Sequence, residues 1–311
     1  MTTVGALANQ NLVLQFLQQL QGQSQNLQAQ ISTGLKSQTY SGLGSSAGQL
    51  VNLQGQVAQG NSYIATIGSV QQRMQEMSTV LSSLQNLTQD FSANLPQGAY
   101  ATTPTGIQAQ AQQFLQEIGD LLNTNDGTRY LFSGSLTSTL PFDASGLPNP
   151  GNLTSSVNGA PPAGYYAGND TVAQARVDNN LVVNYGVTGD NPAFENIIRA
   201  ANFLANLPPG SPSATNSTDV ANINAASNLL TQGIAGLEQI QGTMAGQTAE
   251  LNTAQTNHQN FINLTQTTIG TIESADSATA ITQLNQVETT LQASYSTIAS
   301  LSQLSLVNYL K

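Results

Sequence analysis

The chain has 311 residues, of which only 7% are charged, and it carries a formal net charge of −10 with a pI near 4.1. Ordinary soluble proteins contain about 25% charged residues, so this composition favours a polymer subunit or a secreted surface protein. The six cations stand singly, which excludes the basic patches of nucleic-acid binding, and the absence of cysteine excludes disulfide frameworks and thiolate metal sites.

The first 35 residues contain no ionisable side chain from Asp, Glu, Lys, Arg or His. Large apolar residues recur there at steps of three and four residues or their multiples, at Val13, Leu17, Leu20, Leu27 and Ile31. This spacing predicts the seam of a coiled-coil helix. Because Gln, Asn, Ser and Thr stand where a soluble coiled coil carries charges, we expect this helix to be buried in an assembly of like chains.

Two further helices are predicted downstream of this segment. Residues 40–48 are rich in Gly and Ser, which predicts a loop that ends the first helix. Helical periodicity then returns from about Ala47 to Phe91, and at 1.5 Å per residue this predicts a rod about 65 Å long. After a loop with two prolines, a third helix is predicted over residues 106–122.

In the middle of the chain, the sequence pattern predicts β-strands. Residues 129–134 have the composition of a short strand. Apolar and polar residues then alternate with a period of two over 172–177 and again over 181–187. Because Asn179 and Asn180 suit a tight turn, these two segments are predicted to form a hairpin.

The C-terminal part returns to helix. Asn191 as N-cap and Pro192 in the first turn predict a short helix after the hairpin. From Asp219 a long helical segment is predicted, and Asp276 is predicted to cap the start of the last one. The last helix repeats the pattern of the first, and its predicted seam consists of Ile281, Leu284, Leu291, Tyr295, Ile298, Leu301 and Leu304.

These elements predict a mainly α fold: a long antiparallel helical bundle or coiled coil formed by both chain ends, with a small inserted α+β, β-rich domain. The predicted domains are a terminal coiled-coil assembly domain (1–40 plus 273–311), a helical rod domain (41–134 plus 212–272) and an inserted β-containing outer domain (135–211). In this topology the two termini lie together at one end of the bundle.

Nothing in the sequence indicates an enzyme or a cofactor. His258 is the only imidazole, and it stands in a polar helical segment without a neighbouring carboxylate. The acidic pairs, such as Asp120 with Asp126, are typical of helix ends. We therefore expect no catalytic residue, metal site or cofactor. We also expect no cleavable secretory signal, because Gln and Asn interrupt every apolar run near the N-terminus, and no run reaches the roughly 20 apolar residues of a membrane span.

Both terminal thirds of the chain resemble the bacterial flagellin family, which includes filament flagellins and the hook-filament junction protein. Residues Gln30–Gly34 resemble the family's N-terminal signature. The segments similar to its C-terminal signature are Asp276–Ala280, Leu284, Leu291–Tyr295 and Leu304–Leu306. Within the family, Gly127–Gly134 and Val183–Phe194 resemble segments of junction proteins.

The resemblance implies an extracellular structural subunit that polymerises through its terminal helices into a tube at the hook-filament junction and connects hook to filament for motility. It also implies unfolded export through the flagellar type III apparatus, a cytoplasmic export chaperone at one terminus, and contacts with other hook-associated proteins and flagellin, without nucleic acid or membrane insertion. The alternatives are a filament flagellin and a secreted coiled-coil adhesin or needle-tip protein.

Many flagellins also carry a stretch of the second helix that packs between subunits and is read by a vertebrate innate receptor. The matching positions are Gln72, Arg73, Met74, Glu76 and Met77. Because Gln75 and Val80 depart from the usual Arg and Gln, we do not expect receptor activation. Arg73, Met74, Glu76 and Met77 remain candidates for contacts between subunits in the rod, the charges flanking a Met packing stripe.

Overall fold

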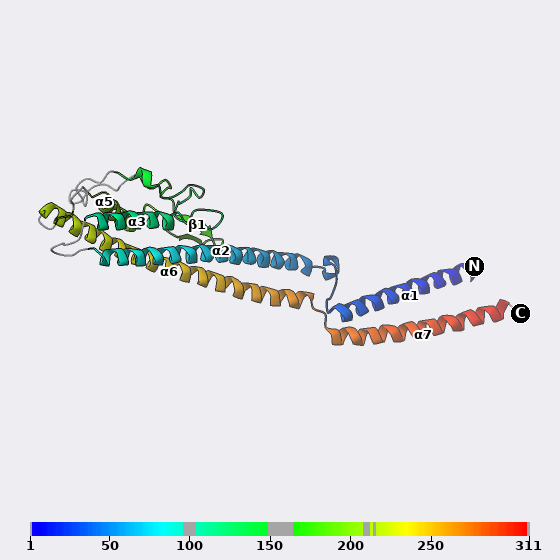
Figure 1. The fold of residues 1–311 in the computed structure, drawn as a ribbon. Helices are drawn as coiled ribbons and strands as arrows, with labels where there is room; N and C mark the ends of the chain where they lie inside the picture. The colour runs from blue at the N-terminus through cyan, green and yellow to red at the C-terminus, as the bar shows by residue number, and fades with distance from the viewer. Residues whose placement is uncertain (1, 96–103, 149–163, 208–211, 214–215, 310–311) are drawn as a thin grey trace. The chain divides into compact units, whose positions relative to one another are not determined.

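A computed structural model describes residues 2–95, 104–148, 164–207, 212–213 and 216–309 (Figure 1), with side chains from residue 12 to residue 300 apart from 96–105, 149–163, 208–211 and 214–215. Its helices and strands are α1 (Thr2–Thr33), α2 (Ser46–Ala93), α3 (Pro104–Leu122), β1 (Ala173–Arg176), β2 (Val182–Tyr185), α5 (Pro192–Ala205), α6 (Ser217–Glu273) and α7 (Ser277–Tyr309). Short 3-10 turns lie at Tyr40–Leu43 and Ala144–Gly146. The predicted mainly α class with a small stranded insertion is confirmed. None of the described helices is long and apolar enough to span a membrane.

The chain divides into two compact units. The terminal unit consists of residues 1–60 and 260–311, and the middle unit consists of residues 61–259. The three domains predicted from the sequence divide the chain more finely than this, and their boundaries stay a prediction.

In the terminal unit, α1 and α7 pack against each other and run antiparallel, with the two chain ends close together (Figure 1). The first turns of α2 and the last turns of α6 also belong to this unit, where Leu50 and Ile262 are buried. Gly60 permits their close approach, because a Cβ there would lie 3.1 Å from the Ile262 side chain. The terminal unit is therefore built from two helix pairs joined by short connections.

The middle unit holds the main hydrophobic core, in which α3 packs against α5. Two aromatic pairs belong to this core. The rings of Phe91 and Phe114 stack with centroids 4.2 Å apart, and those of Phe132 and Phe194 meet edge to face at 5.8 Å. Such pairs add to the stabilisation from apolar burial, so this core is the main source of stability in the unit.

The predicted hairpin is confirmed. Strands β1 and β2 pair antiparallel, with Ala173 opposite Tyr185 and Arg176 opposite Val182. Val183 and Tyr185 point into the core while Val182 is exposed, as the alternating sequence predicts.

The predicted strand at 129–134 is wrong, because the segment forms bends with an isolated bridge between Tyr130 and Asn125. The side chain of Asp126 accepts hydrogen bonds from the backbone N–H groups of Thr128 (2.8 Å) and Arg129 (2.9 Å). Gly127 takes a positive φ of 90° inside this loop, which glycine does without strain. These local bonds compete with strand pairing and wrap the backbone into a turn.

Helix α5 begins as predicted. The Asn191 side chain accepts a hydrogen bond from the backbone N–H of Ala193 at 2.9 Å, and Pro192 is the first helical residue. The apolar face of this helix is buried through Phe194, Ile197, Ile198, Phe203 and Leu204.

Candidate assembly surface on the terminal helices

The facing sides of α1 and α7 form a narrow apolar seam. The α1 side has Leu17, Leu20 and Leu27 buried, with Ser24 at the intervening position of the heptad. The α7 side consists of Ala280, Leu284, Val287 and Leu291, which follow one another at steps of four, three and four residues. Both helices thus follow the coiled-coil repeat, and the seam closes within one copy of the chain.

The structure places the predicted α1 residues largely on this seam. Leu17, Leu20 and Leu27 are buried, and Ile31 is half-buried against the same cluster. Val13 is exposed at the outer end. That these residues also act in assembly between copies stays a prediction.

The predicted α7 residues fall on two faces. Leu284, Leu291 and Ile298 are half-buried, the first two against the seam cluster, whereas Ile281 is 47% and Tyr295 48% exposed. Each helical residue is rotated by about 100° from the one before it, so Ile281 lies well off a seam that contains Ala280. The side chains of Leu301 and Leu304 lie outside those described.

Two α7 seam residues escaped the sequence prediction. Ala280 and Val287 are buried in the cluster with Leu20 and Leu27. Spacing could have found Val287, which stands three residues after Leu284 and four before Leu291. Ala280 is small, and a search for large apolar side chains passes over it.

Other large apolar side chains remain exposed on the same pair of helices. On α1 they include Leu12, Leu14 and Phe16, with Leu12 63% exposed, and on α7 they include Ile281 and Tyr295. The Tyr295 hydroxyl accepts a hydrogen bond of 2.7 Å from Gln21, which ties α7 to α1. Exposed large apolar side chains on charge-poor helices favour contact with a partner.

The N-terminus of α7 is capped by a carboxylate. Asp276 accepts hydrogen bonds from the hydroxyl and backbone N–H of Thr279 and from the backbone N–H of Ala278. These bonds, led by that of the Thr279 hydroxyl, lower the pKa of Asp276 below its usual value. The predicted cap is confirmed, and its negative charge is well placed at the start of the helix.

Solved structures of other proteins have a similar architecture. No family model and no curated protein matches the chain by sequence. Among solved structures, a flagellar hook-associated protein from Vibrio parahaemolyticus is similar with a TM-score of 0.53 and 15% identity, over 71% of this chain and 96% of that one. The chain has the fold of flagellar hook-associated proteins. FlgL of Xanthomonas campestris is also similar, with a TM-score of 0.53 and 13% identity, over 69% of this chain and 98% of the other.

Within the hook-associated fold, the rod candidates for subunit contacts are mostly engaged inside their own chain. Met74 and Met77 are buried in the middle unit of their own chain, and their role in contacts between subunits stays a prediction. Arg73 forms an ion pair with Asp126. Glu76 is partly exposed and accepts a hydrogen bond from Gln72 at 3.2 Å, so it stays a candidate.

Asp126 joins the loop after α3 to α2. Its carboxylate accepts four hydrogen bonds, from the hydroxyl of Thr128 (2.6 Å), the backbone N–H groups of Thr128 and Arg129, and the Nε of Arg73 (3.0 Å). Burial acts to raise the pKa of this carboxyl, but the hydrogen bonds from Thr128, Arg73 and Arg129 hold it well below its usual value. Ionised Asp126 thus links two segments that are 53 residues apart.

Replacing Asp126 with asparagine is expected to lower the free energy of unfolding by about 1.5–3 kcal/mol at neutral pH, since it removes the charge from these bonds. The folded-state pKa is depressed, so this contribution is complete above the unfolded pKa of about 3.9 and is lost as pH falls below it. Urea unfolding at several pH values should therefore show a wild-type advantage that shrinks in acid. The matched control is Asp120→Asn on the exposed side of α3, and an equal loss there would contradict this assignment.

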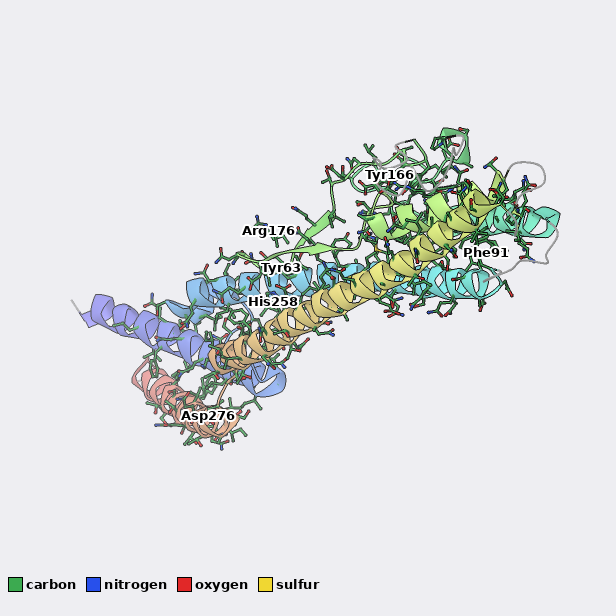
Figure 2. All side chains as sticks on the ribbon, turned by 90° about the vertical axis from the view of Figure 1, so that its left-hand side faces the viewer. Tyr63, Phe91, Tyr166, Arg176, His258 and Asp276 are labelled. Carbon is green, nitrogen blue, oxygen red and sulfur yellow. The ribbon has the colours of Figure 1, made fainter. Side chains whose placement is uncertain are left out.

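The single histidine has a structural partner that the sequence did not reveal. His258 Nε2 lies 2.7 Å from the carbonyl oxygen of Val177, and because a carbonyl only accepts, Nε2 carries the proton. The imidazole also stacks on Tyr63 with ring centroids 5.1 Å apart, and the Tyr63 hydroxyl donates to Asn179 at 2.9 Å. As Figure 2 shows, His258 and Tyr63 lie beside the hairpin strand that carries Arg176. His258 thus helps to fasten the hairpin turn to α2 and α6.

A cleft of about 420 Å³ opens beside the N-terminus of α5. Thr188 and Asn196 line one side of it, and Gln232 and Thr243 of α6 line the other. Its lining contains amides, hydroxyls and apolar groups but no ionisable side chain. Among the residues that the structure describes, no group of three or more acidic or imidazole side chains is placed to hold a metal ion.

Proposed function

We propose that this chain is a structural subunit of the bacterial flagellum that assembles at the hook-filament junction and connects the hook to the filament. The observation that carries the proposal is a pair of charge-poor terminal helices, which close one apolar seam and expose further large apolar side chains, in a chain with the fold of hook-associated proteins. The role is mechanical and requires no catalytic residue or cofactor.

The seam and the exposed apolar side chains have separate tasks in this proposal. The seam of Leu20, Leu27 and Val287 holds α1 to α7 within one subunit. Exposed side chains such as Phe16 and Ile281 pack against neighbouring subunits in the tube. Burial of each large apolar side chain contributes about 1.5–3 kcal/mol, and a polymer repeats this contribution at every subunit.

The same surface also fits an export chaperone and the neighbouring proteins of the flagellum. Before assembly, an uncharged apolar terminus favours aggregation, so a cytoplasmic chaperone that covers it during export fits this surface. After export the subunit is extracellular, and its neighbours at the junction are other hook-associated proteins and flagellin. Glu76 on α2 is a candidate for an additional contact between subunits in the rod.

Immunogold electron microscopy of the producing cells tests the proposed location. Antibodies against residues 141–206 are expected to label a single band where the hook meets the filament, and a strain without the gene serves as the control. Label along the whole filament would show a filament flagellin instead. Flagella without label would contradict a flagellar role and favour a secreted adhesin or needle-tip protein.

A further inference from the structure

Two connections of the terminal unit lie side by side. The chain passes from α1 toward α2 through residues 34–36, and from α6 to α7 through residues 273–275. The backbone N–H of Lys36 donates to the carbonyl of Glu273 at 2.7 Å, and that of Ala275 donates to the carbonyl of Gly34 at 2.8 Å. Leu35 and Ser274 form an antiparallel bridge between these bonds. We call the two segments together the double crossing.

Three helices end or begin at the double crossing. The N–H of Gly34 donates to the carbonyl of Gln30 at 2.8 Å, and its positive φ of 70° ends α1 in the manner that favours glycine. Helix α6 ends at Glu273, and Asp276 caps the start of α7. Both connections thus leave helical geometry where they lie side by side. Neither α1 nor α7 therefore continues from α2 or α6 as one unbroken helix.

Lys36 supplies a side-chain bond across this connection. It is the only charged residue among the first 72, and its Nζ donates to the carbonyl oxygen of Thr271 at 2.9 Å. Thr271 lies in the last turn of α6, where unpaired carbonyls and the negative end of the helix dipole favour a cation. On the other side, Gln54 of α2 donates to the carboxylate of Glu273 at 3.4 Å.

We propose that the double crossing is a joint that orients the α1 and α7 pair as one body relative to the adjoining segments of α2 and α6, and that Lys36 is the pin that selects one orientation. The backbone bonds hold the two connections together, while the seam keeps α1 on α7. The Lys36 ammonium adds a side-chain bond to Thr271, two residues further into α6 than the backbone bond to Glu273. This inference concerns the single chain and does not rest on the proposed function.

The test measures distances between spin labels in the full-length chain in solution. Because the chain has no cysteine, pairs of labelled cysteines can be introduced at exposed positions without removing others. Labels at Gln19 and Gln292 report the α1 and α7 pair, labels at Asn52 and Gln266 report the adjoining segments, and labels at Gln19 and Gln266 span the joint.

Lys36→Met keeps the apolar stem but removes the ammonium. It is expected to raise the population of other orientations about two- to fivefold, seen as broadening of the Gln19 to Gln266 distribution, with both other distributions unchanged. Lys36→Arg, which keeps a cationic donor, is expected to match the wild type. An unchanged distribution across the joint in Lys36→Met, equal broadening in both variants, or broadening within the α1 and α7 pair would each overturn the proposal.

Discussion

Replacing Phe194 with alanine is expected to lower the free energy of unfolding of the middle unit by about 3–5 kcal/mol. The side chain is 0% exposed and meets the ring of Phe132 edge to face, with an angle of 80° between the planes. Its removal loses apolar burial and leaves a cavity, because the surrounding α5 and α3 contacts can close only in part. Urea unfolding followed by far-UV circular dichroism measures the loss.

The matched control for this change is Phe261→Ala. Phe261 lies on α6 in the terminal unit and is 44% exposed, so the same truncation there should change stability by less than about 1 kcal/mol. Similar losses for the two variants would show that the packing of Phe194 is not what stabilises the middle unit.

Replacing Leu20 with aspartate is expected to abolish assembly and leave the middle unit folded. Leu20 is buried in the seam with Leu27 and Val287, and α1 contains no cation that could pair with a new carboxylate. A buried unpaired charge costs about 3–5 kcal/mol, and the cost recurs in every subunit. The measurements are attachment of filaments in complemented cells and thermal unfolding of the purified variant.

Gln19→Asp is the control for charge alone, since Gln19 is the exposed neighbour of Leu20 on α1. Cells that carry this variant are expected to keep their filaments. Filament attachment by Leu20→Asp at the level of Gln19→Asp would mean that the seam is not required for assembly, and loss of the middle unit's folding would mean that the two units are not independent.

Features that depend on near neighbours in the chain could be predicted from the sequence alone. The spacing of Leu17, Leu20 and Leu27 predicted a coiled-coil face because helical residues three and four apart share one side. Asn191 predicted the start of α5 because an N-cap bonds to the backbone two residues on. The low charge of both ends is likewise a property of composition, and it predicts that these helices are buried in an assembly.

Features that depend on partners far away in the sequence became visible in the folded chain. Arg73 and Met74 stand side by side in the sequence, but folding pairs one with a carboxylate 53 residues away and buries the other in the core. His258 binds a carbonyl 81 residues away. The choice of Ala280 over Ile281 for the seam rests on how α7 is rotated against α1, and one residue changes that direction by about 100°. Periodicity gives a helix its apolar stripe, but the face that is buried depends on the surface packed against it.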